Sequence, residues 1–146
     1  MPRNPWLVAG GLLSAAASLM HIGCIVNGPK WYRSFGAPEP LIRAVENGDP
    51  TLHWMTAGIA VILATWSAYA FAGAGLIRRL PLMRTALVAI SAIYLGRGLL
   101  ILPVLSQADP RPFDLWSSLI VLGYGLTYAI GTARAWPLLS QKESFA

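Results

Sequence analysis

The stretch TALVAISAIYLGRGLLILPVL, residues 85–105, is apolar along its length except for a single charged residue, Arg97. A membrane-spanning helix needs about 20 mainly apolar residues, because a rise of about 1.5 Å per residue must cover roughly 30 Å of hydrocarbon. This stretch is long enough to do so. A cation inside such a segment is energetically costly, and Arg97 is therefore the first candidate for a functional residue.

Three further stretches of the same kind complete the chain. The predicted spans are residues 6–26, 52–76, 85–105 and 115–136. With 55% hydrophobic and 12% charged residues, the composition lies outside that of ordinary soluble domains, in which about a quarter of residues are charged. The sequence predicts an all-α integral membrane protein, a four-transmembrane-helix up-down bundle that forms a single polytopic domain over residues 1–146.

Small residues at four-residue spacing predict the faces along which these helices pack. Gly10, Ser14 and Ser18 form such a row in the first span, and the fourth span has Gly123, Thr127 and Gly131. Small side chains allow close approach of helix backbones in lipid, so we expect both rows to lie at helix contacts.

The distribution of charge predicts the orientation. The short loop 77–84 shares one face with both termini, and this face holds six basic residues and one acid: Arg3, Arg78, Arg79, Arg84, Arg134, Lys142 and Glu143. The outer loops, 27–51 and 106–114, hold four basic and five acidic residues. Because Lys and Arg in short loops favour the cytoplasm, we expect a protein of the cell (inner) membrane with both termini cytoplasmic. The net charge of +5 then reflects topology and anionic headgroups, and no nucleic-acid partner is predicted.

The first outer loop is longer than a bare connection needs. Its first half, NGPKWYRSFGAPEP, is rich in proline and glycine, and we expect it to be irregular. Its second half places Leu41, Ile42 and Val45 at helical spacing and ends with the stop signal Asn47-Gly48. This pattern predicts a short amphipathic helix on the outer surface or over the mouth of the bundle.

Two interpretations of Arg97 remain open. The side chain can extend to the headgroups while its stem stays in the apolar layer, or it can face the bundle interior and bind an anion. Tyr94, one turn earlier, lies on the same face. The candidate acidic partners, all on the outer face, are Glu39, Glu46, Asp49 and Asp114. Of these, Glu39 or Glu46 would reach Arg97 if the loop helix folds inward.

The remaining candidate ligand-binding residues are His21, His53 and Tyr124, which share the outer half of the bundle with Arg97. Polar groups gathered at one depth of a membrane bundle are typical of a site or a water-filled cavity. Cys24 is the single cysteine, which excludes an intrachain disulfide. The two histidines match no metal-ligand spacing, so no metal is predicted.

Three functions are compatible with these residues. The first is a pocket in the outer half that binds or acts on a lipid-like or anionic small molecule. The alternative is an accessory subunit of a larger membrane complex, in which His21 could ligate a chlorin or haem. The third is a small homo-oligomeric transporter, which we rank last because no predicted span carries a carboxylate for proton coupling. The chain contains no recognised catalytic or dinucleotide motif, so enzymatic activity and cofactor remain open.

Overall fold

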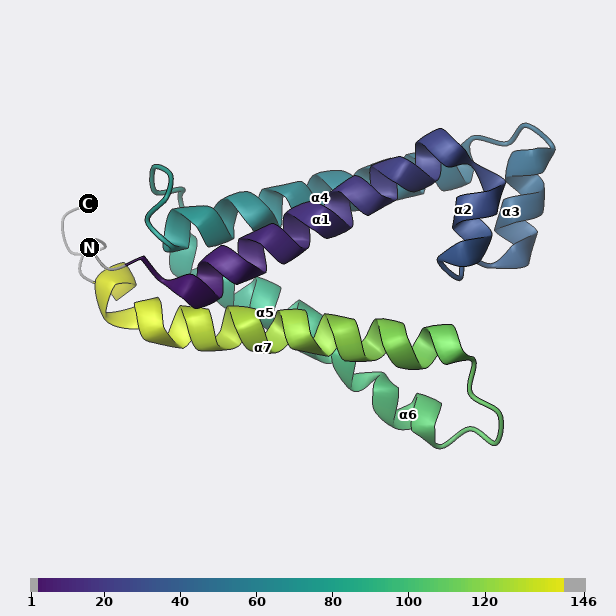
Figure 1. The fold of residues 1–146 in the computed structure, drawn as a ribbon. Helices are drawn as coiled ribbons and strands as arrows, with labels where there is room; N and C mark the ends of the chain where they lie inside the picture. The colour runs from purple at the N-terminus through teal and green to yellow at the C-terminus, as the bar shows by residue number, and fades with distance from the viewer. Residues whose placement is uncertain (1–2, 141–146) are drawn as a thin grey trace. The chain divides into compact units, whose positions relative to one another are not determined.

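The computed structural model describes residues 3–140, which are helical and contain no strand (Figure 1). The helices are α1 (Pro5–Asn27), α2 (Pro29–Ser34), α3 (Glu39–Glu46), α4 (Thr51–Gly73), α5 (Met83–Leu99), α6 (Ile101–Leu105) and α7 (Pro112–Ser140). The helices form two compact units. Unit 1 combines Met1–Ser14 with Trp66–Ala146, and unit 2 is Ala15–Thr65, so α1 and α4 contribute to both.

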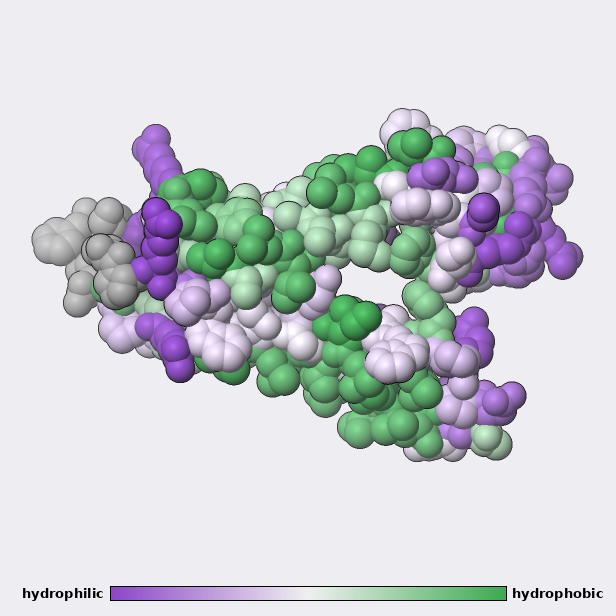
Figure 2. Space-filling view, in the orientation of Figure 1, coloured by the Kyte–Doolittle hydropathy of each residue, from purple (hydrophilic) through white to green (hydrophobic). Residues whose placement is uncertain are grey.

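Four helices among the described residues are long and apolar enough to cross a membrane: Pro5–Asn27, Thr51–Gly73, Met83–Leu105 and Pro112–Ser140. Hydrophobic residues extend along these long helices, whereas hydrophilic residues gather over α2 and α3 (Figure 2). The predicted fold class is confirmed: the chain is an all-α membrane protein with four candidate spans. Two residues used for the charge count, Lys142 and Glu143, lie outside the described part of the chain.

The second span ends earlier than predicted, at Gly73 and not at residue 76. Gly75 adopts a positive φ of 76°, which favours glycine. The Leu76 amide donates to the Phe71 carbonyl at 2.9 Å, and the Gly75 amide donates to the Ala72 carbonyl at 3.1 Å. These two bonds are those of a Schellman motif, which satisfies the last carbonyls of the helix. Gly75 was therefore the stop signal in the sequence.

The third span is divided into α5 and α6 at Leu100. Pro103 has no amide hydrogen, and its ring crowds the carbonyl four residues earlier, that of Leu99. The Leu100 amide instead donates to the Arg97 carbonyl at 3.4 Å, a tighter turn than the α-helix uses. The break thus falls three residues after Arg97.

The fourth span is longer than predicted at both ends. It starts at Pro112, where the missing amide hydrogen costs nothing because the first turn has no carbonyl to donate to. Asp114 lies inside the first turn and accepts from Arg111 Nε at 2.8 Å. At the other end α7 continues past Pro137 to Ser140.

In unit 1, α5 and α7 lie side by side (Figure 1) and pack through glycine. A Cβ atom on Gly98 would lie 2.6 Å from Leu122 Cα, and one on Gly125 would lie 2.8 Å from the Leu95 amide nitrogen. The row predicted for the fourth span is thus corrected in part: Gly123 is exposed and Gly125 makes the close approach to α5, whereas Gly131 lies at a helix contact as expected, against Leu7 of α1.

In unit 2, α2 and α3 lie side by side and close a small apolar core. This core consists of Cys24 from α1, Tyr32 from α2, Ile42 from α3 and Leu52 from α4. The amphipathic helix predicted in the first outer loop is confirmed as α3, with Ile42 fully buried. Helix α2 was not predicted, because the prolines and glycines of the surrounding stretch indicated a loop. Pro29, the one proline within α2, in fact occupies its first turn.

Candidate functional site

Three hydroxyl groups meet inside unit 1, and we call Ser14, Tyr94 and Tyr128 the tyrosine network. Ser14 Oγ lies 2.8 Å from Tyr94 Oη and 2.8 Å from Tyr128 Oη. Tyr128 Oη donates to the Trp66 carbonyl at 3.1 Å. Ser14 and Tyr128 are fully buried. The network therefore ties together side chains from α1, α5 and α7 and the backbone of α4.

The directions of these hydrogen bonds follow from the number of protons. Tyr128 has one hydroxyl proton, which it gives to the Trp66 carbonyl. Ser14 must then donate to Tyr128, and Tyr94 must donate to Ser14. Each hydroxyl gives one proton and the network is fully satisfied, as buried polar groups in lipid require.

Tyr94 lies at the centre of an aromatic cluster. Its ring contacts Trp66 edge-on at 4.9 Å between centroids, Tyr124 at 5.5 Å and Tyr128 at 5.4 Å. Such tilted pairs are favourable geometries for aromatic rings. Two predicted site residues, Tyr94 and Tyr124, are thus in contact, with Tyr94 buried and Tyr124 half-buried. Because the Tyr94 hydroxyl already donates to Ser14, the Tyr124 hydroxyl is the more available of the two for a hydrogen bond to a ligand.

Arg97 follows Tyr94 by one turn on α5, and its side chain is exposed within unit 1. Its Nη1 donates to Ser118 Oγ on α7 at 3.4 Å, a long contact with a neutral group. The single carboxylate in the four candidate spans is Asp114, which binds Arg111. The guanidinium carries five N–H donors, so this one contact leaves most of its hydrogen-bonding capacity available for a ligand.

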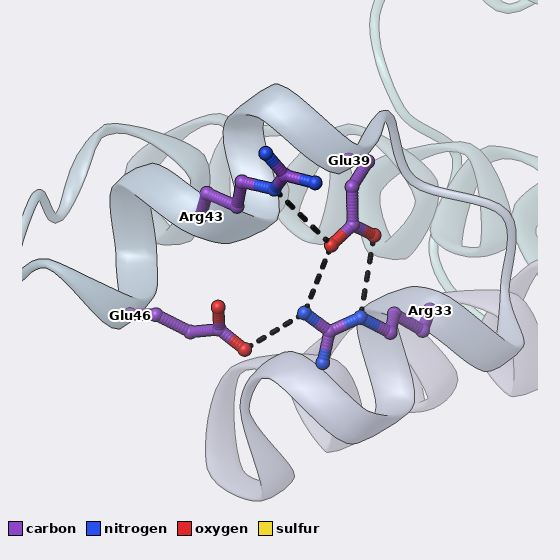
Figure 3. A network of polar contacts seen from close by, with 4 residues as sticks. All are labelled: Arg33, Glu39, Arg43 and Glu46. Carbon is purple, nitrogen blue, oxygen red and sulfur yellow. Dashed lines mark hydrogen bonds and ion pairs between the residues drawn. The ribbon is translucent and has the colours of Figure 1, made fainter.

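The predicted acidic partners of Arg97 have a different partner in unit 2 (Figure 3). Arg33 donates to both carboxylate oxygens of Glu39, at 3.2 and 3.0 Å, and to Glu46 at 2.8 Å. Arg43 adds a longer ion pair to Glu39 at 3.7 Å. The cluster clamps α2 to α3. Arg33 was missed as a candidate, although it precedes Glu39 by six residues across a Gly-Ala-Pro turn.

The geometry of this cluster affects the protonation of its members. Hydrogen bonds from Arg33, helped by its charge, hold the pKa of the Glu39 carboxyl below its ordinary value. Hydrogen bonds to Glu39 and Glu46 raise the pKa of Arg33 further above neutrality. Glu39 and Arg33 are therefore both charged at neutral pH.

The two histidines have separate roles within unit 2. Tyr32 Oη lies 2.9 Å from His53 Nδ1, and Tyr32 is buried in the core under α3. His21 Nδ1 lies 2.7 Å from the Ala17 carbonyl of its own helix. This Nδ1 must carry the proton, so a neutral His21 ring presents Nε2 as an acceptor. Among residues 3–140, no three His, Cys, Asp or Glu side chains are grouped to hold a metal ion.

Comparisons with protein-family models, curated proteins and solved structures give no match to this chain.

Proposed function

We propose that this protein is a multi-pass protein of the cell (inner) membrane that binds a lipid-like, anionic small molecule through Arg97 in the outer half of the bundle. Both termini would lie in the cytoplasm. The orientation is supported by Arg78 and Arg79, adjacent in the short loop after α4. A reporter fused to the C-terminus would be active on the cytoplasmic side, and periplasmic activity would exclude the orientation.

The observation that carries the proposal is that the guanidinium of Arg97 contacts a neutral side chain in the described part of unit 1. A charged arginine within a span costs about 2.5–3.5 kcal/mol on insertion scales, so such residues usually pair with an acid or line a polar cavity. The partner of Arg97 within unit 1 is the neutral Ser118, at 3.4 Å. The Glu39 and Glu46 carboxylates bind Arg33. An anionic ligand would supply the missing negative charge.

Tyr94, one turn before Arg97 on α5, contacts the ring of the half-buried Tyr124 on α7. Tyr124 offers a hydroxyl on α7, and Gly98 keeps α5 close to the backbone of α7 at Leu122. The tyrosine network holds this region rigid, because four helices share its hydrogen bonds. A preformed framework of this kind lowers the entropy cost of binding.

The proposal is tested by binding of an anionic amphiphile to the purified full-length protein. Native mass spectrometry with a long-chain fatty acid and its uncharged alcohol would report the bound amphiphile. We expect selective binding of the acid and a loss of roughly tenfold or more in affinity for Arg97→Leu, because charged hydrogen bonds contribute about 1.5–3 kcal/mol each. Arg97→Lys should also weaken binding, since lysine lacks the planar fork.

The matched control is Arg111→Leu, which removes an exposed arginine from the outer side of α7. This variant should bind like the unmodified protein. Equal binding by Arg97→Leu and the unmodified protein would refute the proposal. Recovery of the protein only together with partner chains, or with a chlorin or haem, would instead support the accessory-subunit alternative.

A further inference from the structure

A cavity of about 330 Å³ lies in unit 1 where the start of α1 meets the ends of α4 and α7. Three arginines line it: Arg3, Arg79 and Arg134. Its apolar wall includes Ala72 and Leu138. None of the described lining residues is acidic. The cavity thus combines three positive charges with an apolar wall, at the end of the bundle opposite to Arg97 on the proposed topology.

Two of the arginines are held in place by contacts within unit 1. Arg79 is half-buried and donates one Nη2 hydrogen to the Leu138 carbonyl at 2.8 Å, which satisfies a backbone group in the last turn of α7. The Arg134 guanidinium lies 5.6 Å from the centre of the Trp6 ring, within the range of a cation–π contact. Each contact leaves several N–H donors available, and neither neutralises the charge.

The N-terminus of α1 is held in place beside the cavity. Asn4 caps this helix: its Oδ1 accepts from the Leu7 amide at 3.3 Å, while its Nδ2 donates to the Gly131 carbonyl at 2.7 Å. The second bond fixes the N-terminus of α1 against α7 beside the cavity. The positive end of the α1 dipole therefore points to the same region as the three arginines.

We infer that this cavity binds a phosphate group, carried by an anionic phospholipid or by a small soluble phosphoester. Arginine is the side chain best matched to phosphate, because its planar fork gives two parallel hydrogen bonds. A volume near the lower end of the range for ligand pockets suits a headgroup and not a whole lipid. The apolar wall would contact the glycerol and the start of the acyl chains.

The test measures binding to the full-length protein in nanodiscs of phosphatidylcholine. The probes are a short-chain phosphatidylglycerol and, as the soluble arm, glycerol 3-phosphate. Arg79→Gln and Arg134→Gln should each weaken binding of the responding probe roughly tenfold, as expected for the loss of a charged hydrogen bond. Arg78→Gln is the matched control, because Arg78 precedes Arg79, is exposed and does not line the cavity. It should change binding less than about twofold.

The two arms separate the sources of the phosphate. Binding of the lipid without competition by glycerol 3-phosphate supports a headgroup site, and effective competition supports a soluble phosphoester. An equal effect of Arg78→Gln and Arg79→Gln would overturn the inference, since it would mean unspecific attraction to charge. Binding of neither probe would overturn it as well. Because Arg79 donates to the Leu138 carbonyl whereas Arg134 contacts the Trp6 ring, a folding defect common to both variants is not expected.

Discussion

The tyrosine network allows a quantitative prediction for Ser14→Ala. The substitution removes both hydrogen bonds of Ser14, to Tyr94 and to Tyr128. Tyr128 can still donate to the Trp66 carbonyl, but Tyr94 loses its acceptor while its ring stays buried. An unsatisfied buried donor costs about 1–3 kcal/mol, whereas hydrogen bonds between membrane helices average about 0.6 kcal/mol. We expect Ser14→Ala to lower the free energy of unfolding by roughly 1–2 kcal/mol, between these limits.

A double-mutant cycle would assign this loss to the Ser14–Tyr94 bond. Tyr94→Phe removes the stranded hydroxyl, so adding it to Ser14→Ala should cost less than it does alone, with a coupling of about 0.5–1.5 kcal/mol. The assay is reversible unfolding of the purified protein in mixed detergent micelles, followed by circular dichroism.

Ser91→Ala is the matched control for this cycle. Ser91 is also buried, but its Oγ donates to the Leu87 carbonyl of its own helix at 2.7 Å, and that carbonyl keeps its place in the helical ladder. This variant should change stability by no more than about 0.5 kcal/mol. If Ser14→Ala costs no more than Ser91→Ala, or if the two changes in the cycle are additive, the network does not join the helices as described.

Two further predictions concern one unit each. Gly98→Ala should lower the free energy of unfolding by about 1–3 kcal/mol because its Cβ would meet the backbone of Leu122, whereas Gly96→Ala, with open space at that position, should be neutral or slightly stabilising in the same assay. In unit 2, the pKa of Glu39 is lowered by Arg33, so the pairing stabilises at pH values above the ordinary carboxyl pKa and is lost as the pH falls through the lowered value. The protection of the α2 and α3 amides against exchange should therefore decrease as the pH falls below the ordinary carboxyl pKa, and Glu39→Gln should lower this protection at neutral pH and reduce its further decrease in acid. Protection that is insensitive to both changes would contradict the clamp.

The four spans could be predicted from sequence because length and hydropathy suffice to define them. The effect of individual prolines, on the third span and on the first outer loop, could not be predicted equally well. Residues 85–105 were predicted as one uninterrupted span, although a proline acts on the carbonyl four residues before it, and Pro103 so breaks the span at Leu100. Pro29 was interpreted as a sign of irregular structure, although a proline in the first turn of a helix is favourable.

The site illustrates a second limit. Arg97 could be singled out because a cation within an apolar stretch is rare, which is a property of the sequence alone. The pairing of Glu39 with Arg33 could not be predicted, because it depends on the fold of the turn between α2 and α3, which brings the two side chains together. Ser14 was expected at a helix contact for its small size, and its use as a hydrogen-bonding centre depends on residues far along the chain.

That separation along the chain has a consequence for biogenesis. Tyr94 and Tyr128 follow Ser14 by 80 and 114 residues, so both partners are absent when the first helix leaves the ribosome. At a synthesis rate of about 5–20 residues per second, Ser14 waits roughly 6–23 s for Tyr128. During this interval its hydroxyl can bond only to a carbonyl of its own helix or to water. Insertion of the helices and their packing through the tyrosine network are thus separate events. The packing can be completed only after the last helix has entered the bilayer.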